Sequence, residues 1–492
     1  MKSRSSNPIL RDGETCWRTE HADKVSVIID AAGYFSALRS AIRQAKHSII
    51  MIGWEFDTRI SLDRCDQDDA PDRLGNFLNW ATEQRPDLKI YMLEWDTGVV
   101  QTLSRGSTPL KILDWAFRSQ IRVKLDHAHP TGAAHHQKIV VIDDVLAFCG
   151  GIDVTAERWD TREHLDTNDL RQRPTTGREY GPWHDATTAV AGDAARALGD
   201  LARKRWYDAT GEKLEAAPES DAIWPEGLQP SFKDIDVAIS RTAPAYGDRT
   251  AIHEIENLYL EIVKTADRHL YIESQYFASR RIADAIAARL GEADGPEIVV
   301  VNPESADGWL EEEVMGSSRA RLLGVLREAD IYDRFKLYTP VTDQGTPIYV
   351  HAKIVICDDR LLRVGSSNLS NRSMGLDTEC DLSIEATTGT SEDTEIRRKI
   401  LALRSDLLSE HLGVSQKAFE SCLEQCDGSL ISTIETLRGE GRTLVPFEAE
   451  ELNFTEDHVL GENELLDPER PAQRFHPFKP KRILSNIFAR EG

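Results

Sequence analysis

The stretches HHQKIVVIDD (135–144) and VHAKIVICDD (350–359) contain the same residue pattern. Each copy has a histidine, a lysine two residues later, four apolar residues and then an aspartate. Four successive apolar residues indicate a short strand that is buried on both faces. Because residues i and i+2 of a strand point to the same side, the histidine and lysine of each copy are expected to project together.

The repeat extends outward from these two stretches. The segments 34–57 (YFSALRSAIRQAKHSIIMIGWEFD) and 258–277 (LYLEIVKTADRHLYIESQYF) each indicate an amphipathic helix, a basic turn and a short strand that ends in aromatic residues. The apolar runs LKIYML (88–93) and PEIVVV (296–301) form a further pair of expected strands. Helices alternate with strands, so each half is predicted to be an α/β unit with a mixed sheet.

The length of 492 residues allows two or three domains. We expect an N-terminal extension (1–24), a first lobe (25–240), a second lobe (241–400) and a helical, then acidic, C-terminal appendage (401–492). The proline-containing stretch 210–250 is the expected linker.

Charge and composition narrow the function classes. The formal net charge of −24 disfavours nucleic acid as a partner. Seven scattered cysteines without a CxxC pair indicate a reduced, cytoplasmic protein. The sequence shows no secretory signal and no apolar run of transmembrane length, so contact with lipid is expected to be peripheral. We expect no cofactor and no metal.

Paired histidines and lysines suit the cleavage of a phosphate diester. One neutral imidazole can attack phosphorus, a second, protonated imidazole can donate to the leaving group, and two lysines can stabilise the charge on the phosphate oxygens. A carboxylate on the far nitrogen of each ring would fix its tautomer. The candidate catalytic residues are His136, Lys138, Asp143, His351, Lys353 and Asp358, with Asp185 and Glu379 as candidates to hold the imidazoles.

Two H-x-K-x4-D motifs, each followed by G-[GS]-x-[ND], resemble the phospholipase D superfamily over roughly residues 25–400. Finer features look like the phosphatidylcholine-type branch: GGID (150–153), ERWDTREH (157–164), PWHD (182–185), YIESQYF (271–277) and GSSNLSNRSMGLDTE (365–379).

The resemblance implies a duplicated phospholipase D-like fold, with two α/β/α lobes and one active site at their interface. It implies that His136 is the nucleophile, which forms a phosphohistidine, and that His351 is the acid and then the base. It also implies roles for Lys138, Lys353 and Asn368 in binding the phosphate and for Asp185 and Glu379 in orienting the imidazoles. We expect the substrate to contact Ser366, Asn368, Gly151 and Trp183.

Some positions depart from the family pattern or are ambiguous. Asp153 stands where much of the superfamily has Asn, and this carboxylate should point at a lysine or a backbone N–H rather than at the phosphate. His164 is expected to be an ordinary core or surface histidine, and His184 is ambiguous. About 25 residues precede the first repeat, so no preceding lipid- or calcium-binding domain and no calcium dependence are expected.

The expected activity is hydrolysis of a glycerophospholipid such as phosphatidylcholine to phosphatidic acid and a free head-group alcohol, with an alcohol able to replace water. The expected protein is a monomer that contacts the membrane surface peripherally. The alternatives are a cardiolipin synthase-like phosphatidyltransferase, a nuclease and a non-catalytic lipid-binding scaffold of the same fold.

Overall fold

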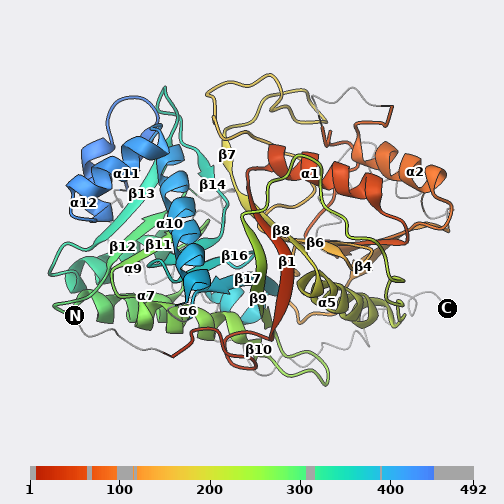
Figure 1. Ribbon diagram of the computed structural model, residues 1–492, viewed down its shortest axis with the longest axis horizontal. Coiled ribbons are helices and arrows are strands. Elements are labelled where there is room, and N and C mark those ends of the chain that lie inside the picture. The colour runs from red at the N-terminus through yellow and green to blue at the C-terminus, as the bar shows by residue number, and fades with distance from the viewer. Residues whose placement is uncertain are drawn as a thin grey trace, which may run out of the picture.

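A computed structural model describes residues 7–63, 69–96, 115, 119–305, 316–387 and 390–447. Within these residues the strands form one sixteen-stranded sheet and one two-stranded sheet. Figure 1 shows the first half of the chain, red to yellow, beside the second half, green to blue. The acidic end of the predicted appendage, 448–492, lies outside the described residues.

The first half alternates helices with short strands. Its elements are β1 (Arg18–Ile29), α1 (Ala31–Gln44), β2 (Ser48–Gly53), α2 (Leu74–Gln84), β3 (Lys89–Trp95), β4 (Ile121–Asp126), β5 (Ile139–Ile142), β6 (Leu146–Gly150), β7 (Trp183–His184), β8 (Ala186–Ala191) and α5 (Asp193–Thr210).

The second half follows a matching order and continues into three further helices and a strand. Its elements are β9 (Phe232–Ala243), β10 (Ile252–His253), α6 (Glu254–Thr265), β11 (His269–Glu273), α7 (Arg280–Leu290), β12 (Glu297–Val301), α9 (Ser317–Ala329), β13 (Phe335–Val341), β14 (Tyr349–Val350), β15 (Ile354–Cys357), β16 (Leu361–Gly365), the π-helix η2 (Arg372–Leu376), β17 (Glu379–Glu385), α10 (Ser391–His411), α11 (Gln416–Gln425), α12 (Leu430–Leu437) and β18 (Thr443–Pro446).

The strands of the large sheet follow a matching order on both sides of its centre, where β1 pairs antiparallel with β9. On one side of β1 follow β8, β6, β5, β2, β3 and β4, and on the other side of β9 follow β17, β16, β15, β11, β12 and β13. In each half the pairs β2–β3 and β11–β12 are parallel, whereas β2–β5 and β11–β15 are antiparallel. The predicted fold class, a duplicated α/β fold with mixed sheets, is confirmed.

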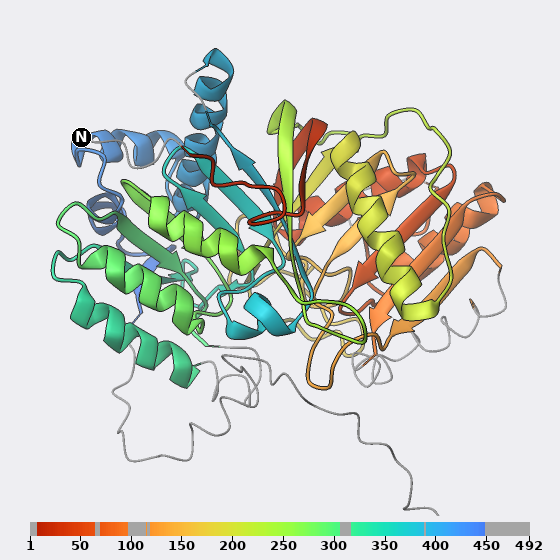
Figure 2. The same ribbon diagram turned by 90° about the horizontal axis from the view of Figure 1, so that it is seen from below.

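Helices cover both faces of the sheet. Helices α1 and α2 pack on one face of the first half, and α6, α7 and α9 pack on one face of the second. The other face carries α5 in the first half and the C-terminal helices α10–α12 in the second, joined in one hydrophobic cluster. Figure 2 shows these layers from below.

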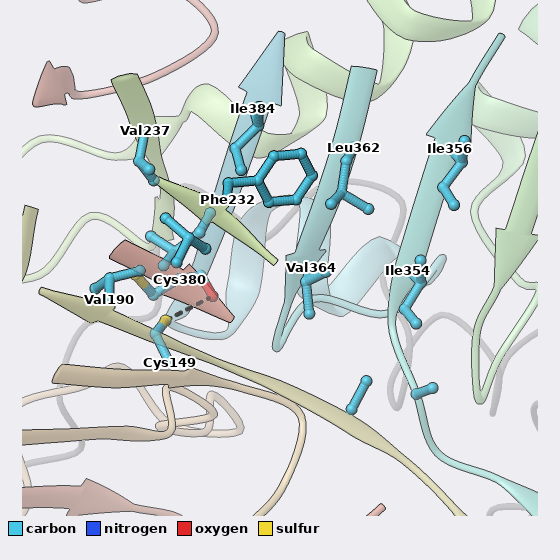
Figure 3. Close-up of a cluster of buried hydrophobic side chains, with 14 of the residues drawn as sticks. Cys149, Val190, Phe232, Val237, Ile354, Ile356, Leu362, Val364, Cys380 and Ile384 are labelled. Atoms are coloured by element: carbon cyan, nitrogen blue, oxygen red, sulfur yellow. Dashed lines mark hydrogen bonds between the residues drawn. The ribbon is translucent and has the colours of Figure 1, made fainter. Parts of the chain in front are cut away.

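The strands that carry the motifs are buried on both sides, as their apolar runs predicted. Ile354 and Ile356 of β15 face the shared cluster with Leu362 of β16, while Val355 faces the helices of the second half. Figure 3 shows this cluster and the thiol of Cys149, which donates to the carbonyl of Cys380 at 3.7 Å across the halves. Each such buried aliphatic side chain contributes roughly 1.5–3 kcal/mol to folding, so the core holds these strands firmly in register.

The bounds of the two lobes stay a proposal. Strand β1 begins at Arg18, before the proposed start of the first lobe at 25, and β9 spans the proposed boundary at 240. Strand β18 adds the C-terminal region to the edge of the second half by pairing with β13. In the described part of the chain, no helix is long and apolar enough to cross a membrane.

Candidate functional site at the interface of the two halves

Each motif histidine enters the site bonded to the opposite half. Strand β14 pairs with β7, and the His351 backbone N–H donates to the His184 carbonyl at 2.7 Å. In the mirrored position, the His136 N–H donates to the Thr378 carbonyl at 3.0 Å. Both histidines are therefore brought to the interface by backbone hydrogen bonds between the halves.

The carboxylate that contacts each motif histidine also comes from the opposite half. Nδ1 of His136 lies 3.0 and 3.1 Å from the two carboxylate oxygens of Glu379. Nδ1 of His351 lies 2.7 Å from Oδ2 of Asp185. An Nδ1–H that donates to a carboxylate leaves the lone pair of a neutral ring on Nε2. Both imidazoles thus present Nε2 as the ring nitrogen available for chemistry.

The lysine of the first half is paired with a carboxylate. Lys138 Nζ lies 3.1 Å from Oδ2 of Asp153 and donates to the His136 carbonyl at 3.0 Å. The other oxygen of Asp153 accepts from the Trp54 N–H at 3.0 Å. The prediction that Asp153 points at a lysine or a backbone N–H is confirmed on both counts.

The hydrogen-bond partners of the second-half lysine are neutral. Lys353 donates to the His351 carbonyl and lies 3.4 Å from Oε1 of Gln275. The same Oε1 accepts from the side-chain amide of Asn368, and Oδ1 of Asn368 accepts no hydrogen bond from the described residues. Asn368 occupies the position in GSSN that Asp153 occupies in GGID, so the two lysines differ in charge environment.

Burial shapes the protonation of the site. Burial, with the charges of Lys138 and Lys353, lowers the pKa of His136 well below its usual range. Burial and Lys353 do the same to the pKa of His351, and His136 itself contributes. Because each ring senses the lysines of both halves, the two motifs share one electrostatic site.

The neighbouring groups are shifted toward neutrality. Burial raises the pKa of Glu379 to about 7 and lowers the pKa of Lys353 to about 7. Burial also raises the pKa of Asp185. Such shifts are common where proton transfer takes place.

The motif aspartates lie at the far ends of their strands. The carboxylate of Asp143 accepts from the backbone N–H groups of residues 46–48 at 2.6–2.8 Å. The carboxylate of Asp358 accepts from the N–H groups of residues 267–269 at 2.8–2.9 Å. These contacts hold the turns that precede β2 and β11, and we propose that both aspartates position the motif strands and take no part in the chemistry.

Three of the predicted substrate-binding residues contact the histidines or the carboxylates that hold them. The Ser366 hydroxyl donates to Glu379 at 2.5 Å, so it holds the carboxylate instead of facing a substrate. A Cβ on Gly151 would lie 2.4 Å from Oδ1 of Asp185, so glycine is what admits this carboxylate. Trp183 lies against the ring of His351, with centroids 5.3 Å apart.

A cavity of about 340 Å³ opens beside Trp183, the residue whose ring lies against His351. Trp183 and Tyr349 line it, and their rings stack with centroids 4.5 Å apart. Tyr349 accepts a hydrogen bond from Gln275 at 2.9 Å, which ties the cavity wall to the neighbour of Lys353.

Behind Asp185 lies a buried cluster that sequence reasoning missed. Asp30, His164, His184 and Glu410 offer two imidazoles and two carboxylates whose ligand atoms all lie within 4.8 Å of one another. This donor set can hold a divalent cation. The four residues come from four separate segments without a shared spacing, so no local pattern pointed to them. His164, expected to be a core or surface histidine, is buried in the core as a member of this cluster.

The geometry defines a duplicated α/β protein in which two imidazoles and two lysines, one of each from either half, make one composite site. Comparison with known families agrees. Residues 41–223 match the family described as "Phospholipase D", and residues 259–399 match "Cardiolipin synthase, PLD-like domain". The chain belongs to the phospholipase D superfamily.

Curated relatives bear the same family name. The chain is 25% identical to Phospholipase D A of Dictyostelium discoideum over 465 residues, which cover 79% of this chain and 36% of that protein. It is 24% identical to Phospholipase D2 of Bos taurus over 476 residues, covering 76% of this chain and 50% of that protein. The chain thus spans between about a third and a half of the length of these relatives.

A solved structure shares the fold. The phosphatidylserine synthase of Haemophilus influenzae matches with a TM-score of 0.51 and 12% identity, covering 85% of this chain and 96% of that one. At this identity the likeness supports the fold alone.

Proposed function

We propose that this protein is a phospholipase D-type phosphodiesterase that hydrolyses a glycerophospholipid, with phosphatidylcholine as the expected substrate. The products are phosphatidic acid and the free head-group alcohol. The observation that carries the proposal is the crossed pairing of His136 with Glu379 and of His351 with Asp185 at one interface.

In the first step, Nε2 of His136 attacks phosphorus and the bond from phosphorus to the head-group oxygen breaks. His351, protonated, donates its Nε2 proton to that oxygen, so the alcohol leaves neutral. The low pKa of His136 suits the attack, because a neutral imidazole has a free lone pair. A bound phosphate anion favours imidazolium at His351, since negative charge stabilises the protonated ring.

In the second step, water attacks the phosphohistidine and the P–N bond breaks. His351, now neutral, takes the proton from the water, which returns both rings to their starting states. Lys138, Lys353 and the amide of Asn368 stabilise the charge on the phosphate oxygens throughout. The cavity is lined by Trp183, whose ring lies against that of His351, and it is the space we assign to the leaving head group.

A second candidate is transfer of the phosphatidyl group to an alcohol. The match of residues 259–399 to a domain described as "Cardiolipin synthase, PLD-like domain" supports it. An alcohol would take the place of water in the second step, with no change in the residues involved.

We further propose a cytoplasmic monomer that contacts membranes peripherally.

The test is incubation of the pure protein with single phospholipids in vesicles, followed by mass spectrometry of the lipid and head-group products, with and without ethanol. Phosphatidic acid and choline are expected without ethanol, and phosphatidylethanol in addition with it. The matched control is the His351→Ala protein. Product formation at equal rates by the variant, or no product from any phospholipid, would overturn the proposal.

A further inference from the structure

The segment that holds the proton donor is itself held by buried acids. Trp183, His184 and Asp185 follow one another in β7 and just beyond it. The Trp183 N–H donates to Oδ2 of Asp160 at 2.9 Å, and the Asp185 N–H donates to Oδ1 of Asp30 at 3.1 Å. Burying a carboxylate is costly unless it is paired and hydrogen-bonded, so two buried acids on one short segment need compensating contacts.

The side chain between them, His184, has a carboxylate near each ring nitrogen. Nε2 lies 2.9 Å from Glu273 at the end of β11. Nδ1 lies 3.3 Å from Asp30 and 3.3 Å from Glu410 at the end of α10. All four residues are less than a tenth exposed, so the contacts are shielded from water.

His184 is joined to His351 by two routes. Its carbonyl accepts the His351 N–H at 2.7 Å, and the next residue, Asp185, holds Nδ1 of His351 at 2.7 Å. A shift of the His184 ring would therefore move both the backbone and the carboxylate that aim the imidazole of His351.

Asp30 shows that the chain tolerates strain to keep this arrangement. Its φ of 64° and ψ of 152° are rare for a residue with a side chain. Its own N–H donates to the Asp185 carbonyl at 2.8 Å, so it holds Asp185 from both sides. Strained residues persist where the surroundings fix them, and they gather at functional sites.

We infer that Asp30, Glu273 and Glu410 act through His184 as positioning residues for the general acid His351. The inference rests on the proposed function and deepens it, because it gives the C-terminal helix α10 a part in one chemical step, protonation of the leaving head group. The other half differs: Glu379, which holds His136, accepts from the hydroxyls of Ser366 and Ser373.

The test compares leaving groups. Choline leaves as a poor anion and needs a proton, whereas nitrophenol leaves readily without one. Glu410→Gln should slow choline release from phosphatidylcholine by about 10- to 100-fold, less than the full worth of a general acid. With a phosphatidyl-nitrophenol substrate, the first-turnover burst of nitrophenolate should stay within about twofold of the unmodified protein, because only the later attack of water needs His351.

The matched control is Asp406→Asn. Asp406 lies one turn before Glu410 on α10, and both contact Arg162. This control removes an Arg162 partner and leaves the His184 contact intact, so both leaving groups should react at normal rates. Ser373→Ala, which loosens Glu379 and the nucleophile, should slow the nitrophenolate burst too.

Equal slowing of both leaving groups by Glu410→Gln would show a general structural role and overturn the inference, as would normal rates on both. If that variant does not fold by circular dichroism, Glu273→Gln, on a different element, is judged by the same two rates. Absence of product from either substrate with the unmodified protein would refute the proposed function instead, so the two failures are distinguishable.

Discussion

The two halves bring the same arrangement of strands to the shared site but place different groups beside their lysines. In the first half, Lys138 is neutralised by Asp153 at 3.1 Å. In the second half, Lys353 lies beside the neutral amides of Gln275 and Asn368, the second of which stands where the first half has Asp153. The two halves share one arrangement of strands, but the Asp153/Asn368 difference gives their lysines different partners.

The carboxylates that hold the histidines differ as well. Glu379 accepts from two serine hydroxyls, a neutral setting, while Asp185 lies against the buried acids around His184. A nucleophile needs a neutral ring and a proton donor needs a charged one. Burial and the charge of Lys353 lower the pKa of His351 in the free protein, so the proposed acid role depends on the negative charge of the bound substrate, which favours the protonated ring.

The largest expected effect comes from removing the histidines. His136→Ala should lower kcat by more than about 10⁴-fold, since the covalent route is lost. His351→Ala should lower it by about 10²- to 10⁴-fold, the usual worth of a general acid. Steady-state choline release measures both. A larger loss in His351→Ala than in His136→Ala would reverse the roles given to the two halves.

The next largest effect on activity is expected from substituting the residues beside the two lysines. Asn368→Asp places a carboxylate near the phosphate and should lower kcat/KM by about 10²-fold through repulsion. Asp153→Asn frees Lys138 of its partner and should change kcat/KM by less than about tenfold, with a lower KM. If the two exchanges have equal effects, the charge difference between the halves has no role in catalysis.

The pH profile should follow the second-half lysine. Its pKa is lowered to about 7 by burial, so in the free protein Lys353 loses its charge as the pH rises through about 7. Because the charged form binds phosphate, kcat/KM should fall on the alkaline side, and Lys353→Arg, which stays protonated, should move that fall to higher pH. An alkaline fall at the same pH in both proteins would assign it to another group.

The smallest effect on chemistry is expected at the motif aspartates. Asp143→Ala or Asp358→Ala removes the acceptor of three backbone N–H groups and should cost about 2–4 kcal/mol of folding free energy. Urea unfolding measures this loss of folding free energy, and activity per folded molecule should change little. Normal stability combined with abolished turnover would return both residues to the catalytic set.

Much of the fold was predictable because each repeated helix and strand has its signal within a short stretch of sequence. The apolar runs of β5 and β15 and the helix patterns before β2 and β11 each lie within a short stretch of sequence. Periodicity detects such elements, and their repetition predicted the duplication. The candidate site residues of the two motifs were proposed for the same reason.

The parts that escaped prediction depend on contacts between distant segments. Glu410 and Asp30 meet His184 only in the folded chain. The hydroxyl of Ser366 was expected to face the substrate, because nothing in the sequence shows that Glu379 takes its hydrogen bond. Sequence patterns name candidate groups, but which donor a buried acceptor takes is decided by tertiary packing.

The most direct test of the central claim is to quench the reaction within the first turnover and locate the bound phosphoryl group by mass spectrometry of peptides. The account predicts a phosphatidyl adduct on the peptide that contains His136, absent from His136→Ala and longer-lived in His351→Ala. An adduct on the His351 peptide, or active turnover with no adduct on either histidine, would contradict it.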